Sequence, residues 1–587
     1  MSIFTDGLAV LNKQSWTVFS ILLTVVWGQI IIVALLQKIF KDQLTISEII
    51  SLSFAGWILP VVLLSVLLFA GVILFGGIAI FVISGLAAIA LTYAMFVGKL
   101  NRATLASCSW FGIAFVVFLI SQLAFLKNLL LPSYFDSAEH YRIIKYFVEY
   151  YASLGGNFPL INYYHVGFHL LSATISQVFQ LGIVDIMLVF GQILLAVLPF
   201  SLFFILKRET ESNAAAIFAC LLAGVGWHMP AHLVDWGKYP ALFSLVGIHF
   251  VLNMGYLAYK KNQSKTGRFA FHLFLCLGAL VSVFLHTRSL IIFGFMGISL
   301  LLVIWRQRLL PLFQQLAFAF VILILIVEML AVQNNAMLAL LFGTYARADV
   351  LTTSLVIFLL IFAAWKFPNL TFFLLILISL MMAGLFIPVT GFLGYGDLTL
   401  LDRPYVQMLL YLPLSIFGGL GLAGLNQFLQ RSIPLQKITV ALLVILVVLN
   451  ANARHSFYPS DCCQIVSSDD LSAIHWMDKT LPSNASILIA STNLLVTSFE
   501  SPDALAGVDG GVWINPLISR KTTPARGNSN FAEPEIHAQV CQKKISYIYV
   551  GGTSQSFNSL QLDKRADWYQ LVFSLPKAKV YRVVGCQ

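Results

Sequence analysis

Acidic, basic and histidine side chains lie close together in the segment YFDSAEHYRIIKYFVEY. Asp136, Glu139 and His140 fall within five positions of one another. A carboxylate in such a setting can accept a proton from a hydroxyl group, which is general-base chemistry. Both acids also fit a capping box at the start of the helix predicted there. We favour the capping role for Glu139 and a chemical role for Asp136.

Histidines and further acids follow near the ends of later apolar runs. His165 and His169 are four residues apart, so they would share one helical face, which is a known metal-ligand geometry. The Glu of the zinc-protease motif HExxH is absent after the first His. Contacts with a substrate or a lipid headgroup are therefore favoured over a histidine–metal site. The other candidates for such contacts are Glu139, His140, Asp235, His286 and Asp402.

The composition predicts that these side chains are positioned by helices that cross a membrane. Hydrophobic residues make up 59% of the 587 residues and charged residues only 10%, whereas soluble domains carry about 25% charged residues. A bilayer crossing needs about 20 apolar residues. We predict an α-helical polytopic membrane protein with about fourteen transmembrane helices, at residues 16–37, 50–74, 76–97, 103–126, 184–206, 213–227, 239–259, 270–285, 289–305, 311–333, 351–366, 369–387, 404–427 and 437–452.

Charge sorts the loops between these helices into two sets. One set, which includes KLNR, KRETES and KKNQSKTGR, carries 15 basic and 4 acidic residues, and the other carries 8 basic and 9 acidic residues. The positive-inside rule assigns the basic set to the cytoplasm. The net charge of +10 is thus explained by topology, and no nucleic-acid partner is indicated. Residues 127–183 and the C-terminal domain then lie outside.

The long external loop, residues 127–183, contains an apolar stretch at residues 163–181. If this stretch crossed the membrane, every later loop would change sides. We therefore predict a helix along the outer interface, with Tyr163, Tyr164, His165 and His169 as its amphipathic edge.

Residues 453–587 are predicted to form a soluble extracytoplasmic α/β domain. Ser468 or Asp469 can cap a helix that ends before Pro482. Strands are predicted at residues 486–490, 546–550, 569–574 and 579–584, with a long loop at 501–534. Four cysteines lie in this domain, and an even number suits an oxidising compartment. We expect that the adjacent Cys462 and Cys463 do not bond to each other.

The order of these parts resembles the GT-C superfamily of membrane glycosyltransferases, which use sugars linked to polyprenyl phosphate. Those proteins carry an acidic residue in the first large external loop, followed by an interfacial helix and a long helix that ends in a basic turn. FDSAEHY, NFPLINYYHVGFHLLSATISQVFQLG and IVDIMLVFGQILLAVLPFSLFFILKRE match that order, and AIHWMDKTLPSNASILIAS resembles the start of their external domains. The resemblance implies an accessory region at residues 1–102, a core at 103–452 and the soluble domain.

On this resemblance Asp136 occupies the catalytic acid/base position. Many relatives have two adjacent acids there, whereas Ser137 follows in this chain. A lipid-phosphate donor leaves as an anion, so cations must lie where its charge develops. Arg403, Arg288 and Lys238 are the candidate phosphate-binding residues. Anchoring at the membrane surface is the alternative for each of them.

The resemblance also bears on cofactors. Some members use a divalent cation such as Mg²⁺ or Mn²⁺ held by carboxylates, for which Asp136 and Asp235 are the candidate ligands; the sequence leaves this open. No nucleotide-binding Walker motif and no CxxC zinc pattern is present. In the predicted loop of the soluble domain, Trp513 has the aromatic character that suits sugar binding.

We therefore expect a glycosyltransferase of the plasma (inner) membrane that works in cell-envelope glycan biosynthesis. It would move a sugar from polyprenyl phosphate to a hydroxyl of a glycan, lipid or protein acceptor, with inversion. Two alternatives remain: a transporter or flippase of lipid-linked glycans, and a non-catalytic scaffold that binds such glycans. A transporter would need polar groups along a path through the bilayer, but the predicted helices are almost free of charge, with Glu328 the main exception.

Overall fold

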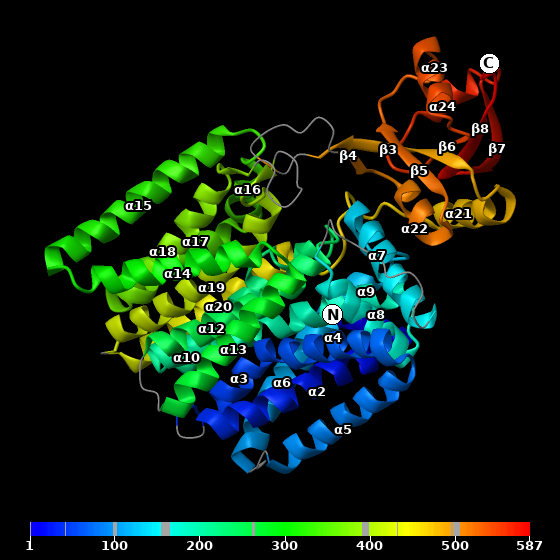
Figure 1. Cartoon of the computed structure of the whole chain (residues 1–587). Helices are drawn as coiled ribbons and strands as arrows, with labels where there is room; N and C mark the ends of the chain where they lie inside the picture. Colours follow the sequence, from blue (N-terminus) through cyan, green and yellow to red (C-terminus); the bar gives the residue numbers. More distant parts are fainter. Residues whose placement is uncertain are drawn as a thin grey trace.

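In a computed structural model, the chain forms a large helical bundle with a smaller α/β domain at its C-terminal end (Figure 1). The structure describes residues 2–40, 43–97, 102–153, 165–260, 265–389, 398–430, 432–494, 497 and 505–586. The candidate site lies where the bundle meets the segment that leads into the α/β domain.

The first six helices pack beside the rest of the bundle. Helix α3 begins at a capping box in which Thr45 and Glu48 exchange side-chain and backbone hydrogen bonds. Trp57 separates helix α3 from helix α4. Residues Ile46–Phe75 nevertheless form one apolar helical stretch that is long enough to cross a membrane. The elements are α1 (Ser2–Lys13), α2 (Ser15–Phe40), α3 (Ile46–Gly56), α4 (Ile58–Phe75), α5 (Ile78–Val97) and α6 (Arg102–Leu123).

Two helices follow in the predicted external loop, after the short η1 (Ala124–Leu126): α7 (Tyr134–Ser153) and α8 (Gly167–Phe179). Every residue from Gly167 to Ser176 is buried, because α8 packs against α4, α7, α9 and α12. The prediction of a helix that presents His165 and His169 to the lipid interface is therefore wrong. Neighbouring helices enclose both side chains, and Tyr163 and Tyr164 lie outside the described residues.

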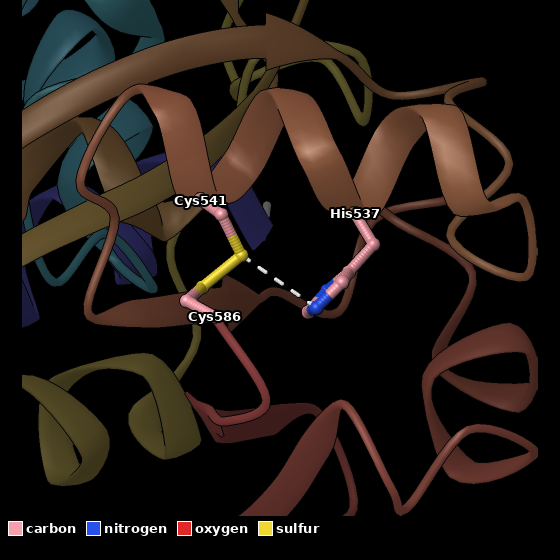
Figure 2. Close-up of side chains that lie close together, drawn as sticks. All are labelled: His537, Cys541 and Cys586. Atoms are coloured by element: carbon pink, nitrogen blue, oxygen red, sulfur yellow. Dashed lines mark hydrogen bonds between the residues drawn. A yellow bond between two sulfur atoms is a disulfide. The ribbon is translucent and has the colours of Figure 1, made fainter.

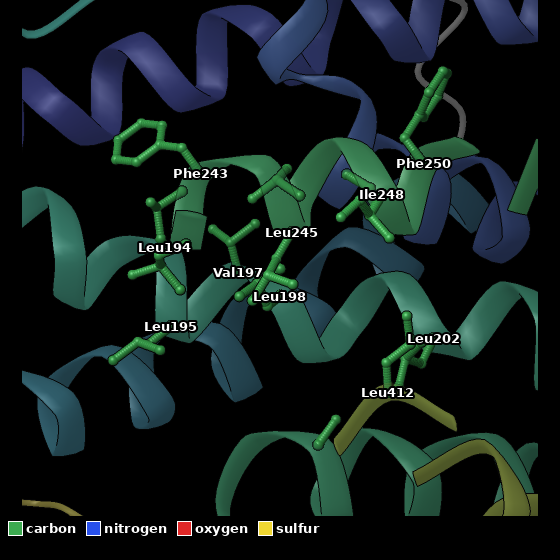
Figure 3. Close-up of a cluster of buried hydrophobic side chains, with 14 of the residues drawn as sticks. Leu194, Leu195, Val197, Leu198, Leu202, Phe243, Leu245, Ile248, Phe250 and Leu412 are labelled. Carbon is green, nitrogen blue, oxygen red and sulfur yellow. The ribbon is translucent and has the colours of Figure 1, made fainter. Parts of the chain in front are cut away.

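The centre of the bundle is mainly apolar, with a few buried polar groups such as His249, which contacts Ser201 and Tyr411. Leu194, Leu198, Phe243 and Leu412 come from four different elements and meet in this core (Figure 3). The elements of this part are α9 (Ile183–Val197), η2 (Leu198–Ser201), α10 (Leu202–Thr210), α11 (Asn213–Leu221), η3 (Leu222–Gly226), η4 (Ala231–Leu233), α12 (Tyr239–Tyr259), α13 (Lys265–Leu285), α14 (Ser289–Arg306), α15 (Pro311–Asn334), α16 (Leu340–Phe342), η5 (Gly343–Ala348), α17 (Val350–Lys366), α18 (Pro368–Gly384), β1 (Pro388–Val389), β2 (Leu398–Thr399), α19 (Arg403–Phe428) and α20 (Ile433–Arg454).

Glycines allow α19 to approach α17 closely. A Cβ atom at Gly421 would lie 2.3 Å from the carbonyl oxygen of Leu359, and one at Gly424 would lie 2.5 Å from that of Phe362. Small residues at a helix interface permit such backbone contact in membranes, where apolar burial by itself gives no preference for helix over lipid. This packing fixes α19, which carries Asp402 and Arg403 at its first residues.

All fourteen predicted membrane segments overlap helices. Within the described residues, ten helical stretches are long and apolar enough to cross a membrane, and α16–η5 with α17 forms an eleventh that is bent by 85°. The other three coincide with shorter apolar stretches, Val82–Tyr93, Phe269–Leu285 and Pro368–Gly384. The fold is thus a polytopic membrane-protein fold, although fewer full-length spans are seen than the fourteen predicted.

Polar contacts join loops that the charge pattern placed on the same side. At one end of the bundle, Asp6 of α1 contacts Lys127 at 2.8 Å and accepts a hydrogen bond from Tyr458. At the other end, Glu209 pairs with Lys260 at 2.6 Å. The first end carries the predicted external loops and the second carries the predicted cytoplasmic loops.

The C-terminal domain contains a six-stranded mixed sheet with helices on both faces (Figure 1). Alternate residues of β3 point to opposite faces: Ile487 and Ile489 pack with α21 and α22, while Leu488 and Ala490 pack with α23 and α24. The elements are α21 (Ser468–Thr480), β3 (Ser486–Asn493), β4 (Leu505–Gly507), η7 (Gly510–Trp513), α22 (Ile514–Ile518), β5 (Lys521–Arg526), α23 (Pro534–Gln542), β6 (Tyr547–Val550), α24 (Ser559–Asp563), β7 (Tyr569–Leu575) and β8 (Ala578–Val583).

The strand predictions at β3, β6, β7 and β8 are confirmed, and the helix predicted before them is α21. Its cap is Ser467, one residue before the predicted position. The predicted long loop at 501–534 is wrong in part, because it contains two short helices and the strands β4 and β5, which pair with β3 in antiparallel and in parallel, respectively. The sequence of β5, KTTPAR, contains Pro524 and few apolar residues, so it does not show the pattern of a strand. Its hydrogen bonds are made with β3, which is distant in the sequence.

The four cysteines of this domain form two disulfides. Cys541 bonds to Cys586, with Cα atoms 5.4 Å apart. Cys462 bonds to Cys463, so the prediction that these neighbours do not pair is wrong. Both residues lie in a turn at 461–463, where successive side chains can face each other.

Candidate functional site

Asp136 lies in the first turn of α7 and forms an ion pair with Lys238. Both side chains are part-buried, with 20% of Asp136 and 30% of Lys238 exposed. The helix begins two residues earlier, so Asp136 lies inside the helix and does not cap it as predicted. Its carboxylate therefore projects from a helix N-terminus, where negative charge is favoured.

Lys238 ends the loop after η4 and immediately precedes α12. The loop reaches this point through Gly237, whose φ of +63° favours glycine. Burial alone would lower the pKa of Lys238, but the carboxylates of Asp136 and Asp402 outweigh burial and raise that pKa. Lys238 is thus a cation that interacts electrostatically with two carboxylates, Asp136 on α7 and Asp402 before α19.

Arg288 and Asp402 form the second ion pair of the site. Asp402 is also the N-cap of α19, because its carboxylate accepts a hydrogen bond of 2.7 Å from the backbone N–H of Tyr405. Burial would raise the pKa of Asp402, yet Arg288 and then Lys238 hold that pKa below its ordinary value. Arg288 lies in the tight turn between α13 and α14, which leaves its side chain little freedom.

A cavity of about 510 Å³ adjoins both ion pairs. Lys238, Arg288 and Asp402 lie at its polar end, together with His165 and His286. Its remaining walls are mainly apolar and come from α12, α14 and α19, among them Ala241, Leu290, Ile291, Pro404 and Met408. The cavity thus has a charged end and an apolar part that lies between helices.

Arg403 follows Asp402 but does not line the cavity. Its guanidinium donates a hydrogen bond of 3.1 Å to Gln407 on the next turn of α19. The structure therefore brings Asp136, Lys238, Arg288 and Asp402 together, with Arg403 beside them.

Four predicted histidines lie close to one another near the cavity, and two of them, His165 and His286, line it. Nδ1 of His140 is 3.1 Å from Nε2 of His169, and the rings of His165 and His286 are 4.3 Å apart. Burial lowers the pKa of His169 and of His286 to about 3, so both are neutral near pH 7. His286 also stacks on Tyr405. Neutral imidazoles can donate and accept hydrogen bonds without adding charge beside Lys238.

The remaining candidates contact other parts of the protein. Glu139 accepts from Arg142 at 2.8 Å and does not complete a capping box with Asp136. Asp235 is buried, where it accepts from Ser460 and pairs with His232. Trp513 is also buried, against Tyr141 of α7, so the prediction that it lies on a solvated loop is wrong. The apolar face of α7 provides that cover, which the local sequence does not reveal.

A shared metal site of Asp136 and Asp235 does not fit this arrangement. Lys238 neutralises Asp136, and three donor contacts from Ser460 occupy the oxygens of Asp235. Within the described residues, the group of three side chains placed closely enough for a metal is His537, Cys541 and Cys586, in the C-terminal domain (Figure 2). Cys541 and Cys586 form a disulfide there, which removes both thiolates as ligands.

Tyr134 is a residue of the site that the sequence reasoning missed. Its φ of +65° is rare for a bulky side chain, and such strain collects at functional sites. Burial and then the charge of Asp136 raise the pKa of its phenol, which also feels Lys238 and Arg403. In the sequence, the only indication that Tyr134 belongs to the site is its position two residues before Asp136.

No family model and no curated protein matches the sequence. The structure is similar to a crystal structure of the Archaeoglobus fulgidus oligosaccharyltransferase in complex with Zn and sulfate. The TM-score is 0.50 at 14% sequence identity, and the match covers 80% of this chain and 72% of the archaeal chain. The chain thus shares the fold of this oligosaccharyltransferase over most of its length, and it carries an α/β domain at its C-terminal end.

Proposed function

We propose that this protein is a membrane glycosyltransferase that transfers a sugar from polyprenyl phosphate to an acceptor hydroxyl at the outer membrane face. The observation that supports it most is the arrangement around the cavity. Asp136 is paired with Lys238, and Lys238 and Arg288 lie at the polar end of a cavity whose other walls are mainly apolar. A lipid phosphate needs both features, cations for its headgroup and a greasy groove for its chain.

The proposed reaction is a single displacement with inversion at the sugar carbon. Asp136 accepts the proton of the acceptor hydroxyl as its oxygen attacks that carbon. The bond to the phosphate oxygen breaks at the same time, and the lipid phosphate leaves with the electron pair. Lys238 and Arg288 offset the charge that develops on it.

Lys238 has a double role in this mechanism. With no substrate bound, it neutralises Asp136 in a part-buried site. Lys238 also lines the cavity together with Arg288 and Asp402, the residues of the second ion pair. A bound phosphate would draw it from Asp136, which frees the carboxylate to receive a proton.

The test is sugar transfer by purified protein in liposomes that contain a lipid-linked sugar. Asp136→Asn should lower the transfer rate by a factor of about 10²–10⁴, the usual contribution of a general base. The matched control is Asp185→Asn, because Asp185 is an acid that accepts a hydrogen bond from Gln14, between α1 and α2, and takes no part in the ion pairs described. Undiminished transfer by Asp136→Asn would remove Asp136 from the mechanism. Movement of the lipid across the bilayer with no covalent product would indicate a transporter.

A further inference from the structure

The segment between α20 and the C-terminal domain runs across the candidate site. It starts after Arg454, the last residue of α20, and ends at α21. Within it, residues 460–463 contact both the loop that carries Lys238 and the start of α7, which carries Asp136. We call residues 460–463 the strap.

The first contact joins the strap to the Lys238 loop. The backbone N–H of Ser460 donates to both carboxylate oxygens of Asp235, at 3.1 and 3.2 Å, and its hydroxyl donates to one of them at 2.7 Å. Asp235 is fully buried and also pairs with Nδ1 of His232 at 2.9 Å. Charge-assisted hydrogen bonds to a buried carboxylate hold the geometry firmly. Asp235 lies only three residues before Lys238.

The second contact joins the strap to α7. The backbone N–H of Tyr134 donates to the carbonyl oxygen of Cys463 at 3.0 Å. Tyr134 has the left-handed φ of +65°, a conformation that non-glycine residues adopt only when their surroundings impose it. The bond to Cys463 is part of those surroundings. Tyr134 lies two residues before Asp136.

The third contact closes the ring. Gly237 packs against Ser137 so closely that a Cβ atom at Gly237 would lie 2.3 Å from the Ser137 hydroxyl. The ion pair of Lys238 with Asp136 follows directly from this approach. The strap, the Lys238 loop and the start of α7 therefore form a closed set of three contacts, and the strap completes two of them.

We propose that Ser460 and Asp235 are positioning residues that set the placement of Lys238 against Asp136 through the strap. This inference rests on the proposed function, since it treats Asp136 as the base. Residues 464–467 connect the strap to α21, so the strap also joins the C-terminal domain to the ion pair. An acceptor that moves this domain would thereby move Lys238 relative to Asp136.

The structural test is hydrogen exchange of the full chain in lipid nanodiscs. Ser460→Ala removes the hydroxyl bond to Asp235, and exchange of the Tyr134 amide should rise about fivefold, the effect of one hydrogen bond. Ser460→Thr keeps a hydroxyl and should restore protection. Tyr458→Phe is the control, because its hydroxyl bonds to Asp6 on α1 and not to the site. Equal exchange at Tyr134 in Ser460→Ala and the wild type, or the same rise in Tyr458→Phe, would overturn the proposal.

The kinetic test separates positioning from general stability. Misplacement of a catalytic pair lowers kcat, so Ser460→Ala should lose about tenfold in kcat with an unchanged KM for the lipid-linked sugar. A rise in Tyr134 exchange with no change in kcat would overturn the coupling to Asp136. If the wild-type chain transfers no sugar, the proposed function fails, but the exchange result still decides whether the strap holds the start of α7.

Discussion

At the scale of single residues, the site depends on two ion pairs that lie close enough for their charges to interact. Lys238 pairs with Asp136 and feels Asp402, while Arg288 pairs with Asp402. Burial opposes the charges of Lys238 and Asp402, and each of these charges has an oppositely charged partner. The sequence identified all four side chains as candidates, because ionisable residues near apolar helix ends are costly without a purpose. Their pairing could not be predicted, since it depends on how loops far apart in the chain meet.

Asp402 offers a separation of two roles at one residue. Asp402→Asn keeps the N-cap of α19, because Asn caps helices as well as Asp does. It removes the negative charge that Arg288 contacts. We expect a lower melting temperature than that of the wild type, because Arg288 loses its partner in a part-buried site, and a clear fall in sugar transfer.

Asp402→Ala removes the cap as well as the charge. We expect it to cost about 1 kcal/mol more stability than Asp402→Asn, measured as a difference in unfolding free energy in detergent. Equal stability of the two variants would show that the bond to the Tyr405 N–H contributes nothing.

At the scale of elements, tight approach of backbones places the ion pairs. The periodicity of apolar residues predicted the helices, and alternation predicted most strands of the C-terminal domain. It did not predict that α8 is covered on all sides, because a buried short helix and an interfacial helix have the same apolar pattern. It also missed β5, whose parallel partner β3 lies some thirty residues earlier in the chain.

Substitution of Gly237 tests whether the close approach of its loop to α7 is needed. A Cβ atom there would lie 2.9 Å from the backbone N of Ser137 as well as 2.3 Å from its hydroxyl, at a positive φ. Gly237→Ala should lower the melting temperature and reduce sugar transfer, since the loop and α7 must separate. The expected destabilisation is about 1–2 kcal/mol from the backbone conformation alone.

Gly255 supplies the matched control in α12. Its Cβ position meets no atom within 4 Å, and its φ is ordinary. Gly255→Ala should leave transfer unchanged and stabilise α12 slightly, because alanine is the better helix former. Similar losses in both variants would show that the close approach at Gly237 is not what matters.

At the scale of the whole molecule, the two ends of the bundle differ in charge and in contacts. The basic loops meet at one end, as in the pair of Glu209 with Lys260, and the acidic and histidine-rich loops meet at the other. Composition predicted the membrane fold correctly, and the helix and strand patterns predicted the α/β fold of the C-terminal region. It could not show that α7 and the C-terminal domain share a core, because neither segment looks incomplete by itself.

Cysteine labelling from outside intact cells tests the sidedness. Ser554 is exposed in the C-terminal domain and Arg308 is exposed at the basic end. Ser554→Cys should react with a membrane-impermeant maleimide, whereas Arg308→Cys should react only after the membrane is opened. The reverse pattern would place the ion pairs in the cytosol and contradict the proposed donor.

Trp513 has a practical consequence for anyone who wishes to prepare the C-terminal domain alone. The indole is capped by Tyr141, and Leu131 and Ala138 belong to the same apolar cluster as Ile474 and Met477. A fragment cut after α20 would expose this cluster to water and invite self-association. Expression trials would do better to retain α7 before any ligand screen is attempted.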